Sequence, residues 1–300
     1  MRTALLSIAL AGGLAAGCVA APGTPPPELP PSDPAAADAA PSAGWNDWDC
    51  KPSAAHPQPV VMLHGLTSNE TDNWDYMAPR LVAAGYCVFS LTYGQGPPQC
   101  GGGGTLPVAD SAQEIAAFMD DVRAATGAPQ VDLVGHSEGG FLALYIPKVL
   151  DRASEVHTVV ALTVEVGETA SGGALVPVDL LGARPLIEGL ADVTGCPAYG
   201  DLAPGSPIRQ ELGAGPIAQP GVAYTVINTR FDELALVLTP FDERLANEPG
   251  IDFMYVQDVC PLDPVGHIGV ASDPSVYGLV ANALDPEHAV PVTCGTGLPL

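Results

Sequence analysis

Short apolar runs alternate along the chain with segments whose apolar positions recur every three or four residues. The runs are rich in β-branched residues and nearly continuous, which is typical of strands buried on both faces of a sheet. Because helical patterns separate the runs, the sequence predicts an α/β fold in which helices cover both faces of a mostly parallel sheet. Strands are expected at residues 59–63, 87–91, 131–134, 157–164, 224–229 and 253–257.

The helical segments carry their own start and stop signals. One helix is predicted to begin at Asn73 and to end at Gly85, and an amphipathic one to end at Gly127. The helix after the third strand contains Pro147, which should kink or end it. Residues 166–220 are rich in Gly and Pro and weakly periodic, so they form either a lid over a site or an excursion with one or two short helices.

The third strand runs into Gly135-His136-Ser137-Glu138-Gly139, and a helix-compatible segment follows. A strand, a sharp turn and a helix in this order place a serine on a strained elbow, where its hydroxyl stands clear of the sheet. The two glycines are a steric need, because a Cβ at either position would clash where the strand and helix pass. Ser137 is the predicted nucleophile.

A serine hydroxyl needs a base, and His267 is the candidate. His267 lies in a loop beyond the last predicted strand, which is where such a base is placed. His288 follows the final helix in a proline-rich tail and is expected to be exposed. His136 adjoins Ser137, but neighbouring side chains at an extended strand end point apart. His157 is expected to be a polar start to a strand.

The base in turn needs an acid to orient it, and Asp232 directly follows a buried strand. Active-site loops of open α/β sheets lie at the carboxyl ends of strands, so the position of Asp232 fits. Asp258 also follows a strand but is too close in sequence to the loop of His267. Glu233 and Asp242 are interpreted as surface carboxylates.

An oxyanion hole needs two main-chain N–H groups, and Glu138, directly after the nucleophile, should supply one. Leu66, in the loop after the first strand, is our choice for the other, and His64 is expected to be buried and to hold that loop by hydrogen bonds. The carboxylate of Glu138 either faces the catalytic loops or turns to solvent or to a donor such as Thr67.

The first 18 residues read as an export signal that ends in a lipobox-like Leu14-Ala15-Ala16-Gly17-Cys18. Lipidation of Cys18 would anchor the chain to a membrane, and simple secretion is the alternative. Residues 19–44, mostly Ala and Pro, form a tether. The catalytic domain is expected to span residues 45–294. We therefore expect an exported protein, either extracellular or at the cell surface.

Seven cysteines are an odd number, and taking Cys18 as the anchor leaves six. In an oxidising compartment six can close three disulfides, although their connectivity cannot be read from the sequence. Their spacing argues against a zinc cluster, and we expect no metal and no cofactor. The candidates are Cys50, Cys87, Cys100, Cys196, Cys260 and Cys294.

A formal net charge of −24 argues against nucleic acid as a partner. Few lysines and arginines, rather than many acids, produce this charge, because only 15% of the residues are charged. The acidity is therefore a matter of solubility and says little about substrate. We expect a monomer.

Taken together, these motifs resemble the bacterial class 2 lipases, which are secreted triacylglycerol lipases of the α/β-hydrolase fold. The resemblance implies Ser137, Asp232 and His267 as the triad, with Leu66 and Glu138 at the oxyanion hole. The chain differs by having Glu138 where the family has glutamine or methionine, and again at residues 165–168. The matching stretches are residues 46–48 and 50, 59–65, 85–89, 131–140, 224–233, 256–261, 267 and 282–286.

From the motif and the resemblance we expect a serine carboxylic ester hydrolase that acts through an acyl-enzyme on lipid-like or short- to medium-chain esters. Two alternatives stay open at this point. One is an acyltransferase or polyester hydrolase with the same triad, since the acyl acceptor is not visible in these residues. The other is a catalytically silent protein of the same fold, tethered for binding.

Overall fold

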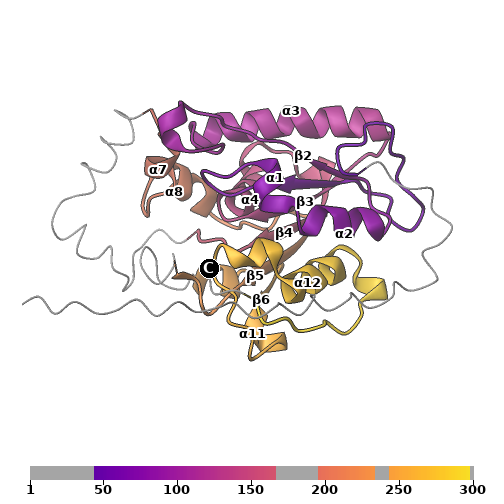
Figure 1. Ribbon diagram of the computed structural model, residues 1–300. Coiled ribbons are helices and arrows are strands. Elements are labelled where there is room, and N and C mark those ends of the chain that lie inside the picture. The colour runs from indigo at the N-terminus through magenta and orange to yellow at the C-terminus, as the bar shows by residue number, and fades with distance from the viewer. Residues whose placement is uncertain (1–43, 167–194, 234–242, 298–300) are drawn as a thin grey trace, which may run out of the picture. The chain divides into compact units, whose positions relative to one another are not determined.

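The computed structural model describes residues 44–166, 195–233 and 243–297 (Figure 1). A six-stranded sheet with the order β2-β1-β3-β4-β5-β6 forms its centre, and all neighbouring strands pair in parallel. The prediction of a parallel α/β sheet is confirmed. The strands are β1 (Val60–Leu63), β2 (Val88–Ser90), β3 (Val131–His136), β4 (Val156–Leu162), β5 (Ala223–Asn228) and β6 (Ile251–Tyr255).

Helices cover both faces of this sheet. Successive side chains of each buried strand point to opposite sides, so each strand contributes to a core on either face. In β1, Val61 and Leu63 belong to the core under α3 (Val108–Thr126) and α4 (Glu138–Val149). Val60 and Met62 belong to the opposite core, under α2 (Met77–Ala83) and α12 (Pro274–Leu284). Figure 1 shows α3 and α12 on opposite sides of the sheet. The shorter helices are α1 (Glu70–Trp74), α7 (Ala198–Asp201), α8 (Pro207–Gly213), α10 (Glu243–Asn247) and α11 (Val256–Val259).

The helix predicted from Asn73 to Gly85 is wrong in its start and in its continuity. Helix α1 begins at Glu70, because the side chain of Asn69 accepts hydrogen bonds from the N–H groups of Thr71 and Asp72 and caps the first turn. The chain leaves the helix after Trp74, and α2 begins separately at Met77. Two helices therefore stand where one was expected.

The sixth strand ends earlier than predicted, at Tyr255. Asp258 Oδ2 accepts the N–H of Tyr255 at 2.9 Å and starts helix α11. The side chain of Gln257, placed in the strand by the sequence pattern, instead donates to Thr229 Oγ1 at 3.0 Å and to the carbonyl of Asp263 at 2.9 Å. This turn brings the end of β6 close to the loops that carry the candidate site.

The structure pairs the six cysteines of the predicted domain as Cys50–Cys87, Cys100–Cys196 and Cys260–Cys294. Helix α3 stops at Gly127 as predicted, and α4 ends two residues after Pro147. In the described part of the chain, no helix has the length and apolar character that a membrane crossing needs.

Several sequence-based predictions fall outside the described residues. They are the export signal with Cys18, the tether, Asp242 and residues 167–194 of the possible lid. The described remainder of residues 166–220, predicted as either a lid or an excursion, contains the two short helices α7 and α8.

Candidate active site

The turn between β3 and α4 holds Ser137 in a backbone conformation that non-glycine residues rarely adopt, with φ 56° and ψ −117°. A Cβ on Gly135 would overlap the carbonyl oxygen of Gly139, and one on Gly139 would overlap that of Leu63 in β1. Both glycines are therefore required by the close approach of α4 to the sheet, as predicted. The elbow presents the hydroxyl of Ser137 at the carboxyl end of β3.

The structure brings together the three residues that the sequence proposed as a triad. Nδ1 of His267 lies 2.8 Å from Oδ2 of Asp232, and Nε2 lies 2.8 Å from Oγ of Ser137. A carboxylate can only accept a hydrogen bond, so the Nδ1 proton faces Asp232 and the Nε2 lone pair faces the serine hydroxyl. Both Asp232 and His267 are buried, at 5% and 6% exposure. This tautomer is the one a general base requires.

The other candidates lie elsewhere. His288 is exposed and bonds to Asp285, as expected for the tail. Asp258 forms an ion pair with Arg230 at 2.6 Å. His157 lies in β4 and contacts the buried Asp132 at 2.9 Å, at the end of the sheet opposite to Ser137.

His136 has a contact that sequence reasoning missed. Its Nε2 lies 2.9 Å from the carbonyl oxygen of His267, and its Nδ1 lies 3.0 Å from Asn73 Oδ1. Burial lowers the pKa of His136 to about 3, so the ring is neutral and carries one proton. A neutral ring carries one proton and a carbonyl oxygen can only accept, so the contact with His267 is a hydrogen bond in the tautomer that carries the proton on Nε2.

The expected oxyanion loop lies against the nucleophile, because a Cβ on Gly65 would come within 3.3 Å of Ser137 Cβ. The N–H of Thr67 donates to the carbonyl of Gly103 at 2.9 Å, and the N–H of Gly103 donates to the carbonyl of Ser68 at 2.8 Å. The glycine-rich segment, residues 101–104, therefore holds the loop that contains Leu66. Glu138 is the first residue of α4, directly after Ser137.

His64, next to this loop, is fully buried and accepts the N–H of Tyr93 at 3.3 Å, as expected for a structural histidine. Burial lowers the pKa of His64 to about 4. Its imidazole is therefore neutral beside the expected oxyanion loop.

The Glu138 side chain neither turns to solvent nor pairs with Thr67, so both of these predicted placements are wrong. The residue is 2% exposed, and neither carboxyl oxygen has a hydrogen-bond partner among the described residues, Thr67 included. A Cβ on Gly104 would overlap Oε2, so the carboxyl group packs against the glycine-rich segment. Burial raises the pKa of Glu138 well above its ordinary value, and the charge of Asp201 adds to this shift.

Glu233, interpreted as a surface carboxylate, also has a different place. Its Oε2 accepts the main-chain N–H of His267 at 2.6 Å, and its Oε1 accepts that of Ile268 at 3.4 Å. The signal available in the sequence was its position directly after Asp232. A loop carboxylate beside a catalytic acid is a candidate for a role at the site.

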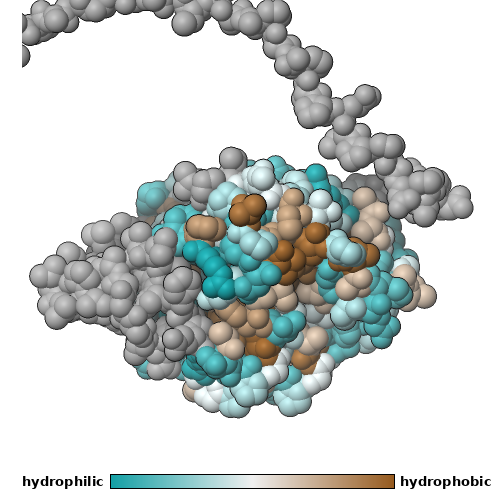
Figure 2. Space-filling model, turned by 90° about the horizontal axis from the view of Figure 1, so that it is seen from below, coloured by the Kyte–Doolittle hydropathy of each residue, from teal (hydrophilic) through white to brown (hydrophobic). Residues whose placement is uncertain are grey.

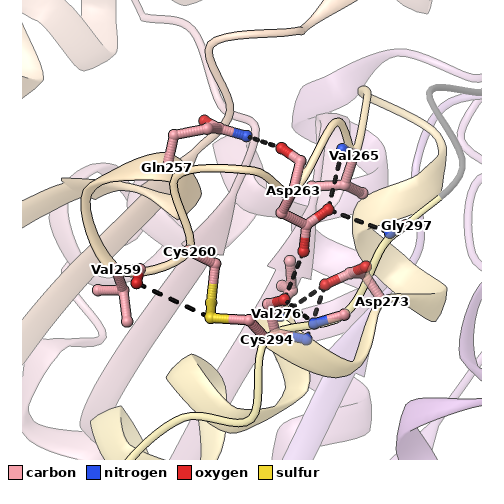
Figure 3. The surroundings of a disulfide bond; sticks show 11 residues. Gln257, Val259, Cys260, Asp263, Val265, Asp273, Val276, Cys294 and Gly297 are labelled. Atoms are coloured by element: carbon pink, nitrogen blue, oxygen red, sulfur yellow. Dashed lines mark hydrogen bonds between the residues drawn. A yellow bond between two sulfur atoms is a disulfide. The ribbon is translucent and has the colours of Figure 1, made fainter.

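The residues that precede His267 are anchored as well, and Figure 3 shows the contacts of Asp263 and Val265. The buried Asp263 accepts the N–H groups of Val265 and Gly297, both at 3.1 Å, and the hydroxyl of Ser275. The disulfide Cys260–Cys294 joins the beginning of the loop to the C-terminal segment. In the described part of the chain, no group of three or more His, Cys, Asp or Glu side chains could hold a metal ion.

Comparison with known proteins identifies the family. Residues 60–300 match the model of the Alpha/beta hydrolase family. The chain belongs to that family. The α/β-hydrolase fold expected from the sequence is therefore confirmed.

A stretch of 101 residues in this α/β-hydrolase is 31% identical to triacylglycerol lipases of Pseudarthrobacter phenanthrenivorans and Burkholderia plantarii. The stretch is 32% of this chain and only 30% and 26% of the two relatives. The predicted resemblance to bacterial lipases is confirmed over this stretch.

Among solved structures, Aspergillus fumigatus lipase B is similar with a TM-score of 0.58 and 16% identity. The similarity covers 84% of this chain and 56% of the other. At this identity it supports the fold alone.

Proposed function

We propose that this α/β-hydrolase is a serine carboxylic ester hydrolase that acts through an acyl-enzyme. The observation that carries the proposal is the hydrogen-bonded order of Ser137 Oγ, the His267 imidazole and the Asp232 carboxylate. A serine on a strained elbow, bonded to a base whose tautomer is fixed by an acid, is the arrangement that nucleophilic acyl transfer requires.

In the proposed reaction, Ser137 Oγ attacks the ester carbonyl while its proton passes to His267 Nε2. The N–H groups of Leu66 and Glu138 stabilise the charge on the carbonyl oxygen. The carbon–oxygen bond to the alcohol then breaks, and the imidazolium returns the proton to the leaving alkoxide. Water then attacks the carbonyl of the acyl-enzyme while its proton passes to His267 Nε2. The bond to Ser137 Oγ breaks, Oγ takes the proton back, and the acid is released. Asp232 holds the imidazole throughout.

Lipid-like or short- to medium-chain esters are the proposed substrates. Two observations support this class: the matched relatives are triacylglycerol lipases, and apolar side chains stand at the surface beside the site. Phe231 precedes Asp232 and is 47% exposed, and Ile268 follows His267 and is 58% exposed. On the face drawn in Figure 2, hydrophobic residues gather in small groups between polar ones.

A fluorophosphonate probe and a series of p-nitrophenyl esters from acetate to palmitate test this proposal. Wild type should be labelled at Ser137 and should hydrolyse the esters. Ser137→Ala should lose labelling and at least about 10³-fold in kcat, because the triad acts as a unit. Equal labelling and hydrolysis by wild type and Ser137→Ala would overturn the assignment.

We also propose that the protein is exported. Three disulfides support this, because such bridges persist in oxidising compartments. Lipidation of Cys18 and a monomeric state stay predictions. Intact-mass analysis of the native protein, with or without a lipid on Cys18, tests the anchor.

A further inference from the structure

The main chain of His267 is held on both sides by the sequence neighbours of the other two triad residues. Glu233 follows Asp232, and its Oε2 accepts the N–H of His267 at 2.6 Å. His136 precedes Ser137, and its Nε2 lies 2.9 Å from the carbonyl oxygen of His267. A movement of Ser137 or Asp232 would therefore also shift His136 or Glu233, which contact the main chain of His267.

We propose that Glu233 is a positioning residue that sets where the imidazole of His267 stands relative to Ser137 Oγ. The inference rests on the proposed ester hydrolysis. Residues 263–268 lie in neither a helix nor a strand, so no regular hydrogen-bond ladder fixes the base. A hydrogen bond from a main-chain N–H to a carboxylate is charge-assisted and stronger than a neutral one, which suits it to this task.

The two consecutive acids, Asp232 and Glu233, bind different parts of His267. Asp232 binds the ring at Nδ1, whereas Glu233 binds the main chain at N and reaches the next N–H at Ile268. Fixing both ends of one residue fixes the torsion angles between them, and so the direction of Nε2. Since Nε2 and Oγ are 2.8 Å apart, a displacement of about 1 Å would break their hydrogen bond.

The test uses the whole protein with Glu233→Ala, Glu233→Gln and a matched control, Glu248→Ala. Glu248 also accepts a main-chain N–H, that of Ile217 at 2.7 Å, but it precedes β6 and so lies at the end of the sheet away from the site. The readouts are kcat and KM on a short-chain p-nitrophenyl ester, the rate of fluorophosphonate labelling, and hydrogen exchange at the amides of His267 and Ile268.

In Glu233→Ala, kcat and the labelling rate should fall together by roughly 10- to 100-fold, because a base displaced by about 1 Å costs that much. KM should stay near wild type, since Glu233 is not proposed to touch substrate, and the His267 amide should exchange faster. Glu233→Gln should recover most of the rate, because the amide oxygen can still accept the N–H of His267. Glu248→Ala should keep wild-type rates.

Wild-type kcat in Glu233→Ala, or a raised KM with unchanged kcat, would overturn the positioning role and leave the ester hydrolase standing. A Glu233→Gln variant as slow as Glu233→Ala would also overturn it, because the accepted hydrogen bond would then not be the cause. Wild-type protein that neither reacts with the probe nor cleaves esters would instead overturn the proposed function, and the positioning role with it.

Discussion

Replacing Glu138 by glutamine should stabilise the protein relative to wild type, and by more as the pH rises. The fold encloses the carboxyl group of Glu138 completely and gives it no hydrogen-bond partner among the described residues. An ionised carboxylate in such a place would be costly, so the group retains a proton. Glutamine has nearly the same shape and carries no titratable proton.

The size of the effect follows from proton linkage. Burial, and then the charge of Asp201, raise the pKa of Glu138 well above its ordinary value. The folded protein therefore keeps a proton that the unfolded chain releases above a pH of about 4.3. The stability that this proton confers is complete below the unfolded pKa and is lost as the pH rises toward the folded pKa. The loss is about 1.4 kcal/mol per pH unit between the unfolded and the folded pKa.

Urea unfolding at pH 5, 6, 7 and 8 measures this directly. The free energy of unfolding of Glu138→Gln minus that of wild type should grow with pH, whereas the same difference for the exposed Glu287→Gln should stay flat. Ester hydrolysis by Glu138→Gln should stay close to wild type near neutral pH, because the main-chain N–H is kept. A difference that does not change with pH would show that Glu138 is ionised in the folded protein, and would refute the protonated state proposed for it.

Two further predictions concern packing and covalent links. Gly139→Ala should lower the free energy of unfolding by about 3 kcal/mol or more, since its Cβ would overlap a carbonyl oxygen of β1. In Gly278→Ala in α12, the new Cβ would meet only a valine side chain at 3.1 Å, so this variant should be neutral or stabilise by up to about 1 kcal/mol. Equal shifts of the unfolding temperature in Gly139→Ala and Gly278→Ala would contradict the steric account. Replacing Cys260 and Cys294 together by serine should cost about 2–4 kcal/mol in urea unfolding and lower kcat on short esters, because the bridge anchors the loop of the base. Unchanged kcat would show that hydrogen bonds alone hold this loop.

The sheet could be predicted from the sequence because strands buried on both faces leave nearly continuous apolar runs. The errors occur where a single polar side chain decides a boundary. Asn69 starts a helix before the apolar pattern begins, and Asp258 stops β6 by capping α11. Hydrophobic periodicity carries no information about such caps, so the boundaries shifted although the elements were present.

At the site, Ser137, Asp232 and His267 could be named because a local motif and strand-end positions point to them. The side chain of Glu138 could not be placed. Whether it is buried depends on the glycine-rich segment that packs on it, and the disulfide Cys100–Cys196 ties that segment to a distant part of the chain. Carboxylates are mostly exposed, and long-range packing is what overrides this expectation at Glu138.

The strand order explains why the base depends on side chains for its place. Ser137 follows β3, whereas the loop of His267 starts beyond β6 and must cross the carboxyl ends of β5 and β4 to reach it. A chain segment that crosses strand ends cannot join the sheet ladder, so its buried main-chain groups need other partners.

Side chains at the strand ends supply these partners in succession. Gln257 donates to the carbonyl of Asp263, Thr229 to that of Val265 at 2.6 Å, and Glu233 and His136 bind the two sides of His267. Each of these contacts reaches the loop of His267 from another element of the chain. Substitutions along this series should therefore reduce kcat more than they reduce the stability of the sheet. The position of the base is set by the loops around it, while the position of the nucleophile is set by the fold itself.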